Sequence, residues 1–130
     1  MNDEQIEQEI QTKGLTAPRV TKADVDDEIA SEHFFTAFDG ALGAASADNQ
    51  DAESAVRVAM GMPPQLQLLT ICVLVLRNGY TVTGESACAS PENFDAEIGR
   101  KLAREKAVEK IWPLIGFRLR DFLSATQARG

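Results

Sequence analysis

The sequence predicts a small α+β domain in which a β-hairpin packs against several helices, with a helical segment at the C-terminus. Two apolar, β-branched runs flank Asn78-Gly79, the dipeptide most typical of a tight hairpin turn. A long amphipathic stretch that begins with helix-capping residues follows this hairpin. Because 130 residues can bury one core but not two independent ones, we expect a single domain over residues 1–130.

The N-terminus is predicted to be a helical arm. Asn2 or Asp3 caps a helix that has carboxylates in its first turn, and Gly14 ends it. Pro18 then breaks the helix, because the residue before a proline is sterically kept out of the helical conformation. Residues 1–20 therefore form an arm ahead of the rest of the domain.

A second helix is predicted to begin at Thr21, which makes a capping-box-like start with Asp24, and to continue to about Phe38. The segment 40–52 is small, polar and aperiodic, so we expect a mobile loop there. The run ESAVRVAMGM predicts another helical turn or two, which two consecutive prolines end.

The hairpin pattern also predicts a register. A two-residue turn pairs Arg77 with Tyr80, and this register places Cys72 and Cys88 on opposite faces. We therefore expect both cysteines to be reduced rather than joined in a disulfide. The first strand, LLTICVLVL, is apolar on both faces, so either helices or a second copy of the chain must cover both.

The stretch SPENFDAEIGRKLAREKAVEKIW is the most strongly helical part of the sequence. Ser90 is the expected N-cap, with Asn93 as a competing cap one turn later. Pro113 is expected to end this helix. The apolar positions expected to pack on the sheet are Phe94, Ile98, Leu102, Ala107, Val108, Ile111 and Trp112.

Beyond this helix the chain is predicted to turn at Gly116 and to resume as a short amphipathic helix. The apolar side chains expected to lie inside are Phe117, Phe122 and Leu123.

Charge is unevenly spread along a chain whose net charge is −7. Residues 1–50 carry eleven carboxylates against three basic side chains, whereas residues 100–120 carry seven basic side chains against two carboxylates. Such an asymmetry can orient self-association or bind an anion, although solvated helix faces also produce it. With a pI near 4.7, direct binding to nucleic acid is not expected.

The sequence offers little to an enzyme, a metal site or a membrane anchor. Cys72 and Cys88 are too few for a structural zinc site, and His33 is the single histidine. We find no phosphate-binding loop, nucleophile elbow or metal-ligand spacing, and no apolar run long enough to span a membrane. We therefore expect no catalytic residue, no metal and no cofactor, with Ser86, Cys88 and His33 as the groups to re-examine if turnover were found.

The stretch TGESACAS has two interpretations. Glu85 and Ser86 add more polarity at the strand end than a strand requires. A bulge followed by a loop explains this structurally. The functional interpretation is a ligand-facing corner where the strand end meets a helix N-terminus.

An anionic ligand would be neutralised by Arg100 and Arg104, which lie one helical turn apart and can form a single clamp. Trp112, two turns further along, offers an aromatic plane, and Arg77 at the hairpin tip is a more distant candidate. The alternative is that both arginines are solvated and Trp112 belongs to the core.

Residues 69–123, LTICVLVLRNGYTVTGESACASPENFDAEIGRKLAREKAVEKIWPLIGFRLRDFL, closely resemble the gene-product-forty-nine-like family of small tailed-bacteriophage proteins. The segment SEHFFTA, at residues 31–37, is similar to the upstream part of the same family. The resemblance implies a phage or prophage accessory protein in the host bacterial cytoplasm. It assigns no catalytic or binding residue, because the family carries no established activity.

Three classes of function follow from these observations. We expect a non-enzymatic accessory protein, acting in host takeover or anti-defence, that binds and sequesters or inhibits a host factor or a defence-signal nucleotide. An acidic DNA mimic, or a nucleic-acid-associated modulator of a host enzyme, is the alternative, because residues 1–50 are strongly acidic. A small enzyme is the third class. We also expect a two-fold homodimer that covers an exposed hairpin edge or matches the unequal charges.

Overall fold

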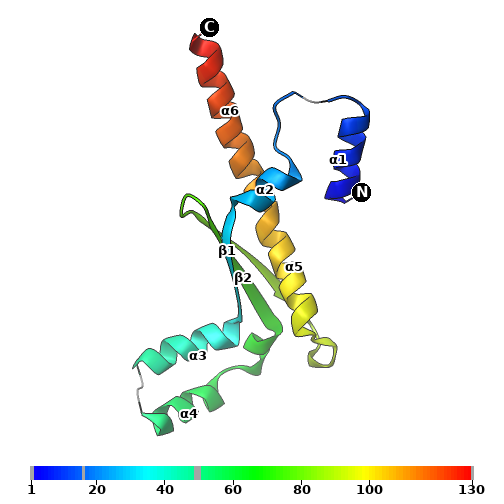
Figure 1. Cartoon of the computed structure of the whole chain (residues 1–130). Coiled ribbons are helices and arrows are strands. Elements are labelled where there is room, and N and C mark those ends of the chain that lie inside the picture. The colour runs from blue at the N-terminus through cyan, green and yellow to red at the C-terminus, as the bar shows by residue number, and fades with distance from the viewer. Residues whose placement is uncertain (1, 16, 49–50, 130) are drawn as a thin grey trace.

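A three-stranded antiparallel sheet forms the centre of the chain. The computed structural model describes residues 2–15, 17–48 and 51–129. The strands lie in the order β1-β2-β3, and helix α5 (Ala96–Glu109) packs along one face of the sheet (Figure 1). The strands are β1 (Ile29–Thr36), β2 (Leu69–Leu76) and β3 (Thr81–Ala87). The α+β class and the hairpin predicted around Asn78 are confirmed.

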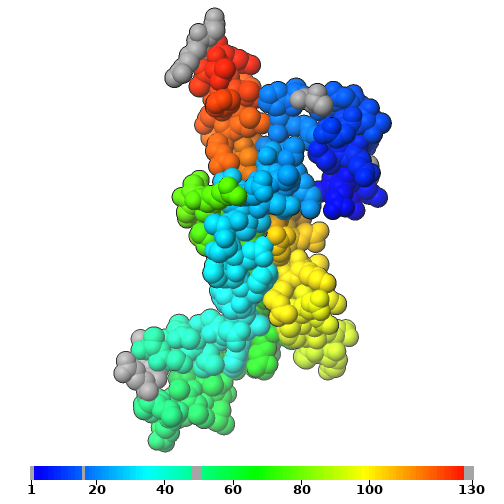
Figure 2. Space-filling model, viewed as in Figure 1, coloured from blue at the N-terminus to red at the C-terminus, as the bar shows by residue number. Residues whose placement is uncertain are grey.

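The other helices extend from this centre in different directions. Helix α6 continues beyond α5 past the hairpin end of the sheet, while α3 and α4 lead away from the opposite end (Figure 1). The molecule is elongated as a result, with α6 protruding at one end and the α3–α4 pair at the other (Figure 2). The bounds are α1 (Asp3–Thr12), α2 (Lys22–Glu28), α3 (Ala37–Asp48), α4 (Ala52–Gly61) and α6 (Ile111–Arg129), with 3₁₀ turns at Pro64–Leu68 and Pro91–Asn93.

Small residues let α5 lie directly against the sheet. A β-carbon placed on Gly84 of β3 would lie 2.1 Å from the Ala103 carbonyl oxygen and 2.4 Å from the Ala107 amide nitrogen of α5. A β-carbon on Gly99 of α5 would lie 2.8 Å from Oγ1 of Thr70 on β2. The core collects beneath this contact: Val25, Cys72, Leu74, Leu76, Val82, Ala103, Ala107, Ile111 and Ile115.

Strand β2 is apolar on both faces, but the two faces have different surroundings. Its even-numbered side chains from Cys72 to Leu76 are buried beneath α5. Its odd-numbered side chains Ile71, Val73 and Val75 are only half-buried, on the face that we call the open face. Among the described residues no helix runs along this face, although Phe35 at one end packs on α3 (Figure 1).

The helix predicted from Thr21 to about Phe38 is shorter in the structure. Thr21 and Asp24 form the predicted capping box, but the helix ends at Glu28 and the chain enters β1. Helical periodicity did not reveal that the aromatic and β-branched residues of IASEHFFT pair along the whole of β2. A bulge near Ala30, between the pairs of Ile29 and Ser31, adjusts the register.

The mobile loop predicted over 40–52 is also wrong for the part that the structure describes. Residues 40–48 belong to α3, and α4 begins at Ala52; residues 49–50 lie outside the described residues. The segment is rich in alanine, the best helix former. Thr36 and Asp39 also cap α3, because each side chain accepts a hydrogen bond from the other's backbone nitrogen at 3.1 Å.

The predicted hairpin register is wrong by one residue. The turn holds three residues rather than two, because the amide of Leu76 donates to the carbonyl of Tyr80 and Gly79 adopts a φ of 88°. The shift places Cys72 opposite Gly84, and it puts Cys88 in line with the same face rather than the opposite one. The cysteines are nevertheless free, as predicted. Gly84 is paired with Cys72 in regular strand, so the bulge considered for the stretch TGESACAS does not occur at this glycine.

The long helix differs from its prediction at both ends. It begins at Ala96 rather than near Ser90 or Asn93, because the side chain of Asp95 caps it by accepting from the Ile98 amide at 3.1 Å. Pro113 does not end a helix but lies in the first turn of α6, where a proline costs no hydrogen bond.

The predicted apolar stripe of this helix is rotated. Ile98 and Leu102 are 56% and 44% exposed, and Gly99 and Ala103 face the sheet in their place. The close approach at Gly84 accounts for this, because only small side chains fit there. Farther along, Gly116 lies inside α6 rather than at a turn. Phe117 and Phe122 were predicted to lie inside the protein, but they are 71% and 66% exposed. The third side chain of this prediction, Leu123, is half-buried.

We predict that Gly84→Ala destabilises the fold, by about 1–3 kcal/mol or more, because its methyl group would overlap the α5 backbone. Urea unfolding followed by circular dichroism measures this. Gly43→Ala is the matched control, since a β-carbon there meets no atom within 4 Å and alanine favours the helix. Equal stability of the two variants would show that α5 does not rest on β3 at this point.

Candidate functional site

A groove lined by α1, α2 and the α5–α6 junction contains two of the predicted site residues. Trp112, half-buried, lines it together with Val108 and Val25. The groove encloses a cavity of about 300 Å³ and an adjoining cavity of about 380 Å³ that extends along α1 to Ile6. We call this the Trp112 groove. The charged residues on its rim are Lys22, Lys101, Arg104, Asp3, Asp26, Glu105 and Glu109.

The rim of the Trp112 groove carries charges of both signs, with three basic and four acidic side chains. Each basic side chain also has a carboxylate partner. Nε of Arg104 donates to Glu32 of β1 at 2.6 Å. Nζ of Lys22 lies 3.5 Å from Asp26, and Nζ of Lys101 lies 3.3 Å from Glu97. An incoming anion would have to compete with these pairs.

Arg100 does not join Arg104 in a clamp. It is exposed and borders a separate cavity of about 110 Å³ beside Phe34 and Asp39. The pairing of Arg104 with Glu32 directs its guanidinium across the sheet edge instead. The structure therefore brings Arg104 and Trp112 to one groove and leaves Arg100 outside it.

The other predicted site residues are dispersed. Glu85 is exposed on the open face opposite Ile71, whereas Ser86 lies on the helix-covered side and borders a cavity of about 140 Å³. Arg77 is exposed at the hairpin tip, and its backbone amide donates to the Glu28 carbonyl at 3.0 Å. The strand end thus contributes no residue to the Trp112 groove.

The three groups reserved as possible catalysts do not converge. His33 is on the open face, where its Nε2 lies 2.9 Å from Oγ of Ser31. Ser86 lies on the opposite face, and the Cys88 thiol donates to the Ser90 carbonyl at 3.2 Å. These contacts satisfy the polar atoms locally.

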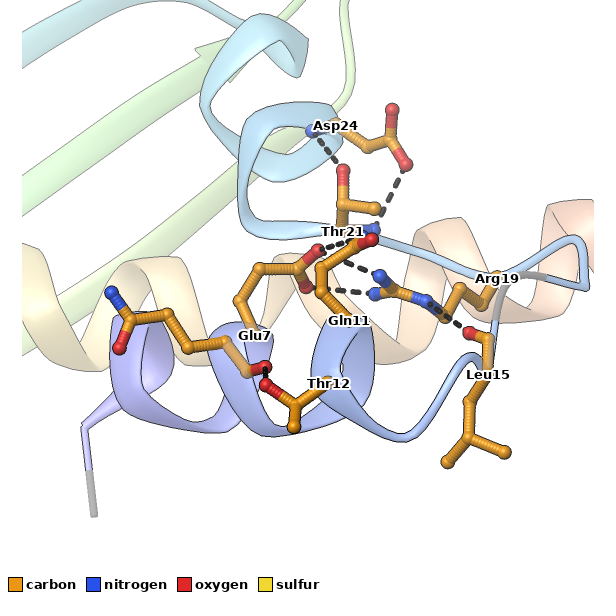
Figure 3. Close-up of polar contacts among 8 residues, drawn as sticks. Glu7, Gln11, Thr12, Leu15, Arg19, Thr21 and Asp24 are labelled. Atoms are coloured by element: carbon orange, nitrogen blue, oxygen red, sulfur yellow. Dashed lines mark hydrogen bonds and ion pairs between the residues drawn. The ribbon is translucent and has the colours of Figure 1, made fainter.

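An ion pair fastens the N-terminal arm beside the groove. Both terminal nitrogens of Arg19 donate to the carboxylate of Glu7, at 2.6 and 2.8 Å (Figure 3). These hydrogen bonds lower the pKa of Glu7 to about 2 and raise that of Arg19. The arm brings Asp3 and Ile6 to the groove. Sequence reasoning missed this pair because its partners lie on either side of the break at Pro18.

A second ion pair, also missed from sequence, holds the base of α6. Both terminal nitrogens of Arg118 donate to the carboxylate of Glu28, at 2.9 and 2.8 Å. The hydrogen bonds from Arg118 lower the pKa of Glu28, although burial opposes this. The pair borders a cavity of about 190 Å³ with Tyr80 and Leu114. Ninety residues separate the partners, so no local pattern announces the contact.

The comparisons with known proteins identify the family. The model of the phage protein (N4 Gp49/phage Sf6 gene 66) family matches residues 20–123. The chain belongs to this phage protein family. Comparison with curated proteins and with solved structures gave no match. The family match begins after α1, so the arm that borders the Trp112 groove lies outside it, whereas α2, α5 and Trp112 lie within.

The described part of this phage protein contains no helix long and apolar enough to cross a membrane.

We predict that Glu28→Gln lowers the free energy of unfolding at neutral pH by about 1–2 kcal/mol, a figure reduced because Arg118 is 56% exposed. The pKa of Glu28 is lowered by folding, so its contribution is present above the ordinary value of 4.5 and is lost as the pH falls through the lowered value. Denaturant unfolding at several pH values should therefore show the two proteins converging at acid pH.

The matched control is Glu53→Gln, which removes an exposed pair with Arg57 and should leave stability unchanged. A constant difference between wild type and Glu28→Gln across this pH range would contradict the assignment.

Proposed function

We propose that this phage protein is a non-enzymatic accessory protein that binds a host protein and thereby sequesters or inhibits it. The Trp112 groove is the observation that carries the proposal. Its half-buried tryptophan and apolar neighbours are surrounded by charges of both signs. Protein interfaces have this composition, with an apolar centre and a polar rim, and tryptophan is among the residues that most often dominate their binding energy.

The mixed charges of the rim favour a protein segment over a nucleotide. A nucleotide brings several negative charges and needs basic groups that can turn towards it. Here Arg104 is held by Glu32 at 2.6 Å, and Lys22 and Lys101 also face carboxylates. A protein segment with an apolar side chain and charges of both signs can bind without displacing these pairs.

The dispersed polar groups support a binding role rather than catalysis. An active site needs a nucleophile or base within hydrogen-bonding reach of its partner. His33 lies on the face of the sheet opposite Ser86. Burial raises the pKa of the Cys72 thiol, which disfavours the reactive thiolate.

A defence-signal nucleotide is the second candidate, favoured by the meeting of Arg104 and Trp112 in one groove. The two candidates separate in one set of titrations. The host protein captured by the full chain from a lysate of the host bacterium is purified, and its binding is measured by calorimetry. A panel of nucleotides and cyclic dinucleotides is titrated in parallel.

We predict that Trp112→Ala weakens binding of the purified host protein by about tenfold or more, because it removes the aromatic centre of the groove. Arg100→Ala is the matched control on the preceding helix, α5, and should change the affinity by less than about twofold, since this residue borders a different cavity. Thermal unfolding verifies that both variants are folded.

A second variant tests the groove while leaving the packing of Trp112 unchanged. Lys101→Glu reverses a charge on the rim at a side chain that is 74% exposed, so it should weaken binding without unfolding the chain. Equal affinity of all variants would exclude the groove as the binding site. Saturable nucleotide binding that is lost in Arg104→Ala would show that the groove binds a nucleotide rather than a host protein.

A further inference from the structure

The distal half of α6 carries apolar side chains that its own chain does not cover. Ile111 is fully buried and Ile115 is 8% exposed, and both lie against the sheet core. Leu119 and Phe122 continue the same side of the helix at spacings of four and three residues. Phe122 is nevertheless 66% exposed, because α6 has passed the end of the sheet (Figure 1). We call these four residues the α6 stripe.

The open face of the sheet is the second uncovered apolar surface. Val73 and Val75 lie at its centre and near its hairpin end, opposite Thr83 and Thr81 of β3. Antiparallel strands with one face in water normally alternate apolar with polar residues, and β2 does not. This strand therefore has the composition of one that is buried on both faces.

We propose that a second copy of this chain joins these surfaces in a two-fold dimer, in which the distal half of each α6 lies on the open face of the partner's sheet. The proposal is independent of the Trp112 groove. One chain carries both the uncovered distal end of the α6 stripe, at Leu119 and Phe122, and an uncovered sheet face. A two-fold axis matches each with its counterpart at the same time.

The placement of α6 fits this arrangement. A two-fold axis in the plane of the sheet, across the strands and at the hairpin end, sets the two sheets end to end in one layer. The partner's sheet is then inverted, so its open face looks towards the layer of α5 and α6. The side of α6 that faces its own sheet at Ile115 therefore faces the partner's sheet at Phe122.

The dimensions also agree. Residues 119–129 extend about 16 Å at the helical rise of 1.5 Å per residue. Strand β2, with eight residues, is about 26 Å long. Each α6 would thus cover the half of the open face nearest the hairpin, where Val73 and Val75 lie.

Charge does not oppose this contact. Arg118 is already paired with Glu28 of its own chain. Arg120 points about 160° away from Phe122 at the helical turn of about 100° per residue. The stripe therefore places no arginine against the valines of the partner.

The test is the molar mass of the full chain, measured by light scattering over a concentration series. Wild type should approach twice 14.1 kDa. Phe122→Glu should raise the dissociation constant by about tenfold or more, because it places a charge against the partner's valines. This substitution is in the projecting part of α6 and leaves the core intact.

Phe117→Glu is the matched control. Phe117 is 71% exposed on the same helix but points about 140° away from Phe122, so the dissociation constant should change by less than about twofold. Val73→Glu, on the open face, should dissociate the dimer as Phe122→Glu does. A monomeric wild type at the highest soluble concentration would overturn the proposal. Equal effects of the Phe122 and Phe117 variants, or no effect of Phe122→Glu, would do so as well.

Discussion

The backbones of α5 and β3 meet at Gly84, and this contact determines how α5 lies on the sheet. Because no β-carbon separates them, α5 lies low on one face of the sheet and uses Ala103 and Ala107 as its contact surface. The larger side chains Ile98 and Leu102 are displaced to its flanks. This placement also sets the start of α6 at the hairpin end, where the pair of Glu28 and Arg118 holds it.

Helix α5 covers one face of the sheet and leaves the other face of β2 half-buried. The second face of β2 is as apolar as the first, and the stripe of α6 runs past the sheet that buries its beginning. The proposed dimer rests on these two surfaces. The rim of the Trp112 groove holds its basic groups in ion pairs, and the proposed contact with a host protein rests on this feature.

The sequence predicted what depends on local chemistry and missed what depends on distant partners. The Asn78-Gly79 turn, the Thr21 capping box and β2 were evident because short-range patterns determine them. Strand β1 was mistaken for helix, because its pairing with β2 joins residues about forty apart. Arg104 and Trp112, both named as candidates from the sequence, share a groove, but the partner Glu32 that binds Arg104 could not be foreseen.

An isotope-filtered nuclear Overhauser measurement tests most directly whether the partner's α6 covers the open face as proposed. Chains with labelled valine methyl groups are mixed with unlabelled chains, so that contacts between copies are observed separately. If the dimer forms as proposed, the methyl groups of Val73 and Val75 contact the ring of Phe122 in the other copy. Methyl groups that show no contact with the other copy, or a Phe122 ring that contacts only its counterpart, would contradict it.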